Sequence, residues 1–312
     1  MSLNILFAAR PERWATYEQP LRTAFADAGL TDVNLATEMK PEEVDYIVYA
    51  PNGDVQDFTP YIRTKAVLNL WAGVEDVVDN ATLTQPLARM VDEGLTRGMV
   101  EWVTGHTLRH HLNTDLHVLH QDGKWRKEDV PPLACDRPVT ILGLGALGQA
   151  CGEAIAGLGF PVTGWSRTPK SVESITCLSG DDGLEKALQA AQILILLLPL
   201  TPETENVIDA AALARLPRGA FIINPGRGPL IDDDALLKAL EFGQVAHATL
   251  DVFREEPLPA DHPFWAHEKV TVTPHIASET RPASASRVIA ENIRRGEAGE
   301  PFLHLVDRQA GY

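Results

Sequence analysis

One segment constrains the fold more than any other, the glycine-rich stretch Gly143-Leu144-Gly145-Ala146-Leu147-Gly148. It follows strand-like residues 138–142 and opens a helical stretch over 149–158. In such a turn the first glycine permits the tight bend, the second lets a pyrophosphate approach the backbone, and the third lets the helix pack closely. The helix N-terminus then offers N–H donors to phosphates. Three spaced glycines alone are a weak signal, and a ligand-free glycine turn is the alternative, but the strand–turn–helix context predicts a dinucleotide site. The predicted contacts are Gly143, Gly145, Ala146, Leu147 and Gly148.

The rest of the chain alternates strand-like and helix-like segments. The expected strands are 4–8, 45–49 and 65–70 in the first part, and 139–142, 162–165, 193–197, 220–224, 247–251 and 270–272 in the second. The strongest apolar run, Ile193 to Leu200, suits a strand buried on both faces of a parallel sheet and is far too short to span a membrane. This alternation predicts an α/β protein with parallel sheets.

The domain boundaries follow from the segments that break this rhythm. An uninterrupted helical stretch over 97–122 and a polar loop over 121–138 mark the crossing into a second domain. A last helix, over 283–296, is expected to return toward the first domain. The sequence therefore predicts one domain from 1–98 plus 280–312 and another from 99–279.

Composition excludes several classes of protein. The chain has 27 Lys and Arg against 43 Asp and Glu, a formal charge of −16. Nucleic-acid binding and attachment to a membrane surface both need clustered cations, so neither partner is expected. Three cysteines make no disulfide framework, and the N-terminus lacks a signal-peptide pattern, so we expect a reducing cytoplasm.

The strand after the glycine loop predicts which dinucleotide binds. An NAD-selective site places Asp or Glu at the end of this strand to hold the ribose 2′-OH. Here the strand runs into Ser166, Arg167, Thr168 and Lys170, with no carboxylate. Hydroxyls and cations suit a 2′-phosphate, so NADP(H) is expected, with NAD(H) as the weaker alternative and Arg167 as the main cation. The other interpretation is that Arg167 and Lys170 are solvated loop charges.

Three further strand ends carry groups suited to reduction of a 2-oxo acid. Arg227 follows 220–224, the acids Glu255 and Glu256 follow 247–251, and His275 follows 270–272. Ligands of open α/β sheets bind outside the carboxyl ends of the strands, so these side chains are expected at one crevice.

Together these segments resemble the D-isomer-specific 2-hydroxyacid dehydrogenases. The stretches Trp-Ser-Arg-Thr-Pro-Lys (165–170), 273–283 and 306–312 are most similar to the glyoxylate/hydroxypyruvate reductase A branch of that family. The resemblance covers essentially the whole chain. It implies a doubly wound dinucleotide-binding (Rossmann) domain inserted in a flavodoxin-like substrate-binding domain. The chain departs from the family at Pro225-Gly226, where small or aliphatic residues are usual, and a pocket Trp typical of the branch has no counterpart around 49–51.

The resemblance also implies roles for single residues. Arg227 grips the substrate carboxylate and carbonyl oxygen, His275 protonates the carbonyl oxygen, and Glu256, which matches the family spacing from Asp251, orients the imidazole. Asp251 resembles the partner of the nicotinamide carboxamide. The loop at Trp71, Ala72, Gly73 and Val74 resembles one whose amides hold the substrate carboxylate, an ordinary left-handed turn at Gly73 being the alternative. Further cofactor contacts are expected from Leu198, Pro199 and Thr204.

A group of histidines needs a separate interpretation. His106, His110, His111, His117 and His120 crowd one helical region. His106 and His110 stand four residues apart, but the sequence HTLRH lacks the glutamate of the zinc motif HExxH. We expect solvated or interface residues and no metal. In the family this helix and the following loop, with Trp125, contribute to a homodimer interface.

The predicted function is NADPH-dependent reduction of a small anionic 2-oxo acid, of the glyoxylate or hydroxypyruvate type, to the 2-hydroxy acid. Formate dehydrogenases carry Gln where Glu256 stands. Phosphoglycerate dehydrogenase would prefer Asp at the Ser166 position and often has a regulatory C-terminal domain. The alternative that is not an enzyme is a dinucleotide-sensing corepressor or scaffold. The presence of Arg227, Glu256 and His275 together argues against it.

Overall fold

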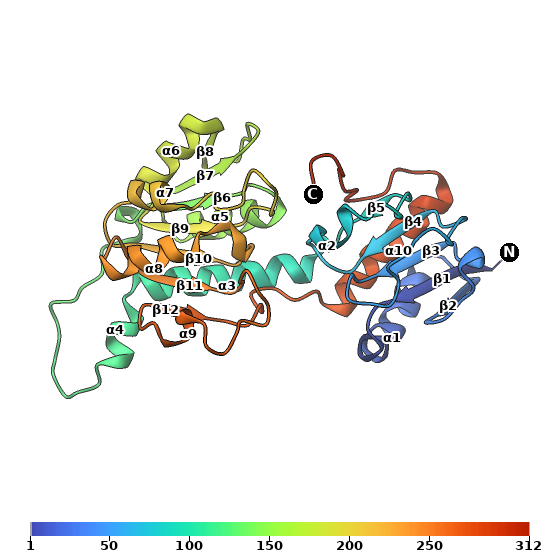
Figure 1. Cartoon of the computed structure of the whole chain (residues 1–312), viewed down its shortest axis with the longest axis horizontal. Helices are drawn as coiled ribbons and strands as arrows, with labels where there is room; N and C mark the ends of the chain where they lie inside the picture. Colours follow the sequence, from blue (N-terminus) through green and yellow to red (C-terminus); the bar gives the residue numbers. More distant parts are fainter. Residues whose placement is uncertain (1, 312) are drawn as a thin grey trace. The chain divides into compact units, whose positions relative to one another are not determined.

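The computed structural model describes residues 2–311. The chain divides into two compact units, one running to Leu95 and resuming at Glu279, the other spanning Thr96–Ser278. The sequence placed these boundaries at 98 and 280. Figure 1 shows each unit as a sheet with helices packed around it. Every strand pair within the two sheets is parallel, which confirms the predicted fold class.

The sheet of the second unit has seven strands in the order β12-β11-β10-β9-β6-β7-β8. The chain starts in β6, moves outward through β7 to β8, and then returns to β9 on the other side of β6. In sheets of this kind, dinucleotides bind at the carboxyl ends of the strands where the order reverses, which are here β6 and β9. The strands are β6 (Val139–Leu142), β7 (Val162–Ser166), β8 (Thr176–Ser179), β9 (Ile193–Leu196), β10 (Ala220–Asn224), β11 (Val245–Leu250) and β12 (Val270–Val272).

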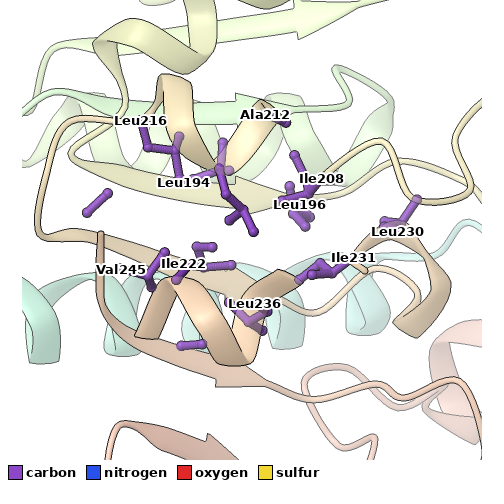
Figure 2. Close-up of a cluster of buried hydrophobic side chains, with 14 of the residues drawn as sticks. Leu194, Leu196, Ile208, Ala212, Leu216, Ile222, Leu230, Ile231, Leu236 and Val245 are labelled. Atoms are coloured by element: carbon purple, nitrogen blue, oxygen red, sulfur yellow. The ribbon is translucent and has the colours of Figure 1, made fainter. Parts of the chain in front are cut away.

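The central strand β9 is buried on both faces, as its apolar sequence predicts. Leu194 and Leu196 pack with Ile222 beneath helices α7 (Ala210–Arg215) and α8 (Asp233–Glu241), as Figure 2 shows. Ile193 and Ile195 point to the opposite face, into the cluster formed with α3 (Glu93–His111) and α5 (Ala146–Gly157). Two apolar layers therefore fix the strand ends that carry the candidate site. The remaining helices of this unit are α4 (Thr114–Leu119), α6 (Gly180–Ala190) and α9 (Pro263–Ala266).

The sheet of the first unit has five strands in the order β2-β1-β3-β4-β5, the order of flavodoxin-like folds. The strands are β1 (Leu3–Ala8), β2 (Val33–Ala36), β3 (Tyr46–Tyr49), β4 (Ala66–Asn69) and β5 (Leu87–Ala88). Helices α1 (Pro11–Asp27) and α10 (Pro282–Ala298) share one buried cluster, in which Leu21 and Phe25 meet Ile289 and Ile293. The last helix therefore completes the core of the first unit. This unit also contains the short helix α2 (Glu75–Val78).

The structure departs from the sequence prediction in two respects. The expected single helix over 97–122 is wrong, because α3 ends at His111 and Asn113 adopts a left-handed conformation with φ 52° before α4 begins. Asparagine tolerates that region better than most residues. The sequence also missed β2, β5 and β8, which all lie at sheet edges, where one neighbour is absent and the apolar pattern is short. No helix within residues 2–311 is long and apolar enough to cross a membrane.

Candidate active site

The glycine loop lies between β6 and α5, at the point where the strand order reverses. Gly143 has φ 106°, and a Cβ there would collide with the carbonyl of Leu197. A Cβ at Gly148 would collide with the carbonyl oxygen of Gly143, so this glycine lets α5 pack against the turn. Nothing lies within 4 Å of the place where a Cβ of Gly145 would stand. The first and third glycines thus serve the turn, and the second leaves open backbone that fits an approaching pyrophosphate.

The end of β7 forms a tight polar turn. Ser166 is buried and donates from Oγ to the carbonyl of Thr168 at 2.8 Å. Arg167, Thr168 and Lys170 are exposed beyond it. A hydrogen bond from Thr201 and, more weakly, the charge of Arg167 hold the pKa of Glu203 below its usual range. The turn therefore presents a cation beside the loop that follows β9, with Ser166 fixing the backbone.

The loop after β9 is ordered by Thr204. Its hydroxyl donates to the carbonyl of Pro199 at 2.7 Å and accepts from the backbone N–H of Thr201 at 2.8 Å. Leu198, just before it, is buried. Thr204 therefore folds the loop, and a contact with the cofactor would have to be made in addition to this role.

Asn224, the last residue of β10, holds the segment that carries Arg227. Its amide nitrogen donates to the carbonyl of Arg227 at 2.9 Å, and its amide oxygen accepts from the N–H of Gly226 at 3.1 Å. A Cβ at Gly226 would lie 2.8 Å from the carbonyl oxygen of Leu196, which is closer than a real side chain allows. The departure from the family pattern at Pro225-Gly226 thus has a local reason, and Asn224 is a residue that the sequence did not single out.

Asp251 holds the loop of His275. Its carboxylate is fully buried and accepts from the hydroxyl of Thr273 at 2.5 Å and from the N–H groups of Ile276 and Ala277 at 2.9 and 2.8 Å. The backbone N–H of His275 donates to the carbonyl of Asp251 at 2.8 Å, and His275 itself has φ 53°. The structure therefore gives Asp251 a positioning task, which the sequence did not anticipate.

His275 and Glu256 form a direct pair. Nδ1 of His275 lies 2.6 Å from Oε2 of Glu256, and Oε1 of Glu256 accepts from the N–H of Phe253 at 2.9 Å. Glu256, and not its neighbour Glu255, is thus the acid that contacts the imidazole. With Nδ1 engaged, Nε2 is the ring nitrogen that remains for a ligand.

The pair shifts both protonation equilibria toward the charged forms. The hydrogen bond to Glu256 raises the pKa of His275, and this effect outweighs the burial that opposes it. Burial alone would raise the pKa of Glu256, but the hydrogen bonds from His275 and Phe253 outweigh it and leave that pKa below its usual range. The positive charge of Arg227 lowers both pKa values to a lesser extent, so its guanidinium acts electrostatically on the pair. The second unit therefore brings Arg227, Glu256 and His275 together.

In the first unit, the loop of Trp71, Ala72, Gly73 and Val74 follows β4. Asn69 donates from its amide to the carbonyl of Gly73 at 2.9 Å, and the carbonyl of Trp71 accepts from the N–H of Met90 at 2.9 Å. These two hydrogen bonds hold the loop against its own unit. The alternative, an ordinary left-handed turn at Gly73, stays a prediction beside the carboxylate-binding role.

Two of the crowded histidines are buried, which corrects the expectation of solvated or interface residues. His110 stacks on Phe221 at 4.8 Å between ring centroids, and its Nε2 lies 2.9 Å from the hydroxyl of Thr249. His111 packs edge-on against Phe160. His117 and His120 are exposed. Sequence spacing did not separate these two groups, because the helix breaks between them.

Comparison with known proteins fits this geometry. A family model for the NAD binding domain of D-isomer specific 2-hydroxyacid dehydrogenases matches residues 105–277. The chain belongs to this family. The matched region contains the glycine loop, Arg227, Glu256 and His275.

Relatives of this dehydrogenase cover most of its length. Glyoxylate/hydroxypyruvate reductase A of Yersinia enterocolitica is 40% identical over 260 residues, which cover 80% of this chain and 82% of the relative. A solved D-isomer specific 2-hydroxyacid dehydrogenase from Xanthobacter autotrophicus Py2, in complex with NADPH and MES, has a TM-score of 0.93 and 40% identity and covers 100% of both chains. The NADPH-dependent glyoxylate/hydroxypyruvate reductase of Sinorhizobium meliloti, in complex with NADP and sulfate, has a TM-score of 0.86 and 32% identity over 100% of both chains.

Proposed function

We propose that this dehydrogenase reduces glyoxylate, hydroxypyruvate and similar 2-oxo acids to 2-hydroxy acids with NADPH. The observation that carries the proposal is the 2.6 Å contact between His275 and Glu256 beside Arg227, in the same unit as the glycine loop. The names of the Yersinia and Sinorhizobium relatives support the substrate class. Arg227, Glu256 and His275 are the proposed catalytic residues.

The residues divide the reaction among them. The bound dinucleotide supplies a hydride to C2 of the substrate. Arg227 binds the carboxylate and the carbonyl oxygen through its planar, permanently charged fork. Nε2 of His275 donates a proton to that oxygen, which becomes the hydroxyl group of the product. Glu256 orients the imidazole through Nδ1 and keeps it protonated at higher pH. In the first unit, the backbone of Trp71, Ala72, Gly73 and Val74 is our proposal for further carboxylate binding.

The turn after β7 is the proposed selector for the 2′-phosphate. Ser166 shapes the turn, and Arg167, Thr168 and Lys170 supply donors on its exposed side. The solved relatives in complex with NADPH and NADP support this choice, with NAD(H) as the weaker cofactor. Gly143, Gly145, Ala146, Leu147 and Gly148 are proposed for the pyrophosphate, and Leu198, Pro199, Thr204 and Asp251 for the nicotinamide half.

The cofactor assignment is tested by comparing kcat/KM for NADPH and NADH. The wild-type enzyme should prefer NADPH. Arg167→Asp should reverse the preference, since loss of an arginine–phosphate contact costs about tenfold to a hundredfold and the new carboxylate repels the phosphate. Lys186→Asp, an exposed charge change on α6, is the matched control and should leave the ratio unchanged. A wild-type preference for NADH would refute the assignment.

The assignment as an enzyme is tested with a panel of 2-oxo acids and NADPH. Glyoxylate and hydroxypyruvate should be reduced with measurable turnover. Failure to reduce any member of the panel would favour the dinucleotide-sensing corepressor or scaffold.

The segment from α4 to residue 133 supports a homodimer as the working form. It exposes several large apolar side chains, among them Val118, Leu119, Val130 and Leu133, and Trp125 is 91% exposed. Isolated apolar residues are common on surfaces, but a group of them along one segment marks an interaction site. Light scattering should give the mass of a dimer, and a monomer would contradict the proposal.

We also place the protein in the cytoplasm, where its free Cys135, Cys151 and Cys177 would stay reduced.

A further inference from the structure

A polar cavity of about 360 Å³ lies at the amino ends of the central strands of the second unit. Arg137, Gln192 and Gly219 line it, and each stands one or two residues before a strand, namely β6, β9 and β10. Because these strands are parallel, their carboxyl ends, which carry Gly143 and Arg227, lie at the opposite edge of the sheet. The cavity is therefore distinct from the candidate active site.

The lining of the cavity is cationic. Its polar side chains are the guanidinium groups of Arg137 and Arg218 and the amides of Asn113 and Gln192. No Asp or Glu is among the lining residues within the part of the chain that the structure describes. In a chain of formal charge −16, a cavity with two cations and no acid is an exceptional environment. Its chemistry favours an anionic ligand.

Arg137 is the lining residue whose surroundings most favour binding of an anion. Its Nε is buried and has no hydrogen-bond partner in the structure. The guanidinium lies 5.7 Å from the centroid of the Phe221 ring, and burial lowers its pKa. Arg137 is half-buried, and a partly desolvated cation is stabilised by an opposite charge or by hydrogen bonds beyond what the aromatic face provides. An oxyanion in the cavity would supply both.

The side chains are the donors that remain for this ligand. The backbone N–H groups of Arg137, Gly219 and Ala220 donate to the carbonyls of Ala134, Gln244 and Pro217. Arg218 donates from Nη2 to the carbonyl of Phe242 at 2.8 Å, which anchors one edge of its guanidinium. A guanidinium fork anchored in this way suits bidentate binding of a phosphate or carboxylate.

We propose that this cavity binds a small oxyanion, a phosphate or a carboxylate, between Arg137 and Arg218. The site is independent of the proposed reduction, because none of its lining residues belongs to the cofactor loop or to the Arg227, Glu256 and His275 group.

The test is titration calorimetry of the full-length enzyme with inorganic phosphate and, separately, with succinate, at constant ionic strength. Saturating NADPH keeps phosphate out of the cofactor site. Arg137→Met and Arg218→Met should each weaken binding about tenfold or more, the effect of losing one charge-assisted contact. Arg215→Met removes an exposed cation on α7 that does not line the cavity and should leave binding unchanged. The two anions distinguish a phosphate site from a carboxylate site.

Two results would overturn the proposal. One is binding of equal strength in the wild type and in both variants, which would locate the anion elsewhere, for example at Arg227. The other is no binding of either anion to the wild type, together with weaker self-association of the variants in sedimentation, which would show that a second copy covers the cavity. Arg218 is exposed, so Arg218→Met keeps the test valid if Arg137→Met fails to fold.

Discussion

His275 and His110 lie in the same unit and have opposite properties. The side chain of His275 is 50% exposed and its Nδ1 contacts the carboxylate of Glu256, which raises its pKa. His110 is 2% exposed and its Nε2 contacts the neutral hydroxyl of Thr249. Burial, helped by the nearby positive charge of Arg109 and the second histidine His247, lowers the pKa of His110 to about 2.

The difference shows that solvent and the charge of the partner, and not the residue type, decide what a histidine does. The raised pKa of His275 favours the protonated imidazole, and Nε2 is the ring nitrogen that remains to donate the proton. His110 stays neutral, stacks on Phe221 and links α3 to β11. We therefore expect substitution of His275 to affect turnover and substitution of His110 to affect stability.

The largest effect is expected at His275. His275→Asn removes the proposed proton donor and should lower kcat by about 10² to 10⁴, the usual contribution of a general acid. Steady-state kinetics with glyoxylate and NADPH measures the loss. His117→Asn, at an exposed position on α4, is the matched control, and His110→Gln should also stay near wild-type turnover. A near-normal kcat in His275→Asn would show that His275 is not the proton donor.

A smaller effect is expected when the partner of His275 loses its charge. In Glu256→Gln an NH2 group replaces one of the two carboxylate oxygens that contact Phe253 and His275, and the negative charge is lost, so the pKa of His275 should fall. The reduction needs protonated His275, so activity should be lost at lower pH than in the wild type. Each unit by which the pKa falls costs about tenfold in the protonated fraction on the alkaline side. The measurement is the pH profile of kcat/KM. A descending limb at unchanged pH would show that Glu256 does not control this proton.

The smallest effect is expected in the contribution of His110 to the stability of the folded protein at acidic pH. Its pKa in the folded protein, about 2, lies below the ordinary value of 6.5. As pH falls below 6.5, the unfolded chain binds a proton that the folded chain excludes. Stability is therefore lost between pH 6.5 and about 2, with a slope of up to about 1.4 kcal/mol per pH unit from this group.

Urea unfolding between pH 7 and pH 5 checks this slope. His110→Gln keeps a group that bonds Thr249 and should lose stability less steeply on acidification than the wild type. His247, whose pKa is lowered to about 4 chiefly by burial, acts in the same direction and leaves part of the slope in place. His117→Gln, the exposed control, should follow the wild type. Parallel slopes in wild type and His110→Gln would mean that His110 is not held neutral.

Features set by neighbouring residues were predictable from sequence. The glycine loop was recognisable from the spacing of glycines within six residues, although Gly143 also meets the distant carbonyl of Leu197. The central strand β9 was recognisable from an unbroken apolar run. Edge strands such as β8 were not predicted, because their residues are partly exposed and apolar and polar residues do not alternate clearly along them. The break at Asn113 was missed although Asn113, Thr114 and Asp115 all have low helix propensity, because the apolar residues Leu112 and Leu116 continue on either side of it.

The sequence by itself determined the fold class, the place of the dinucleotide loop and the strand ends that bear Arg227, Glu256 and His275, since each is fixed by local spacing. The contact of Glu256 with His275 was expected from the family resemblance. Only the tertiary structure decided that Asp251 holds the His275 loop, that His110 is buried and that Arg137 and Arg218 share a cavity. These properties arise between segments far apart in the chain. Burial and pairing set the energy of a charge, and both depend on which segments the fold brings together.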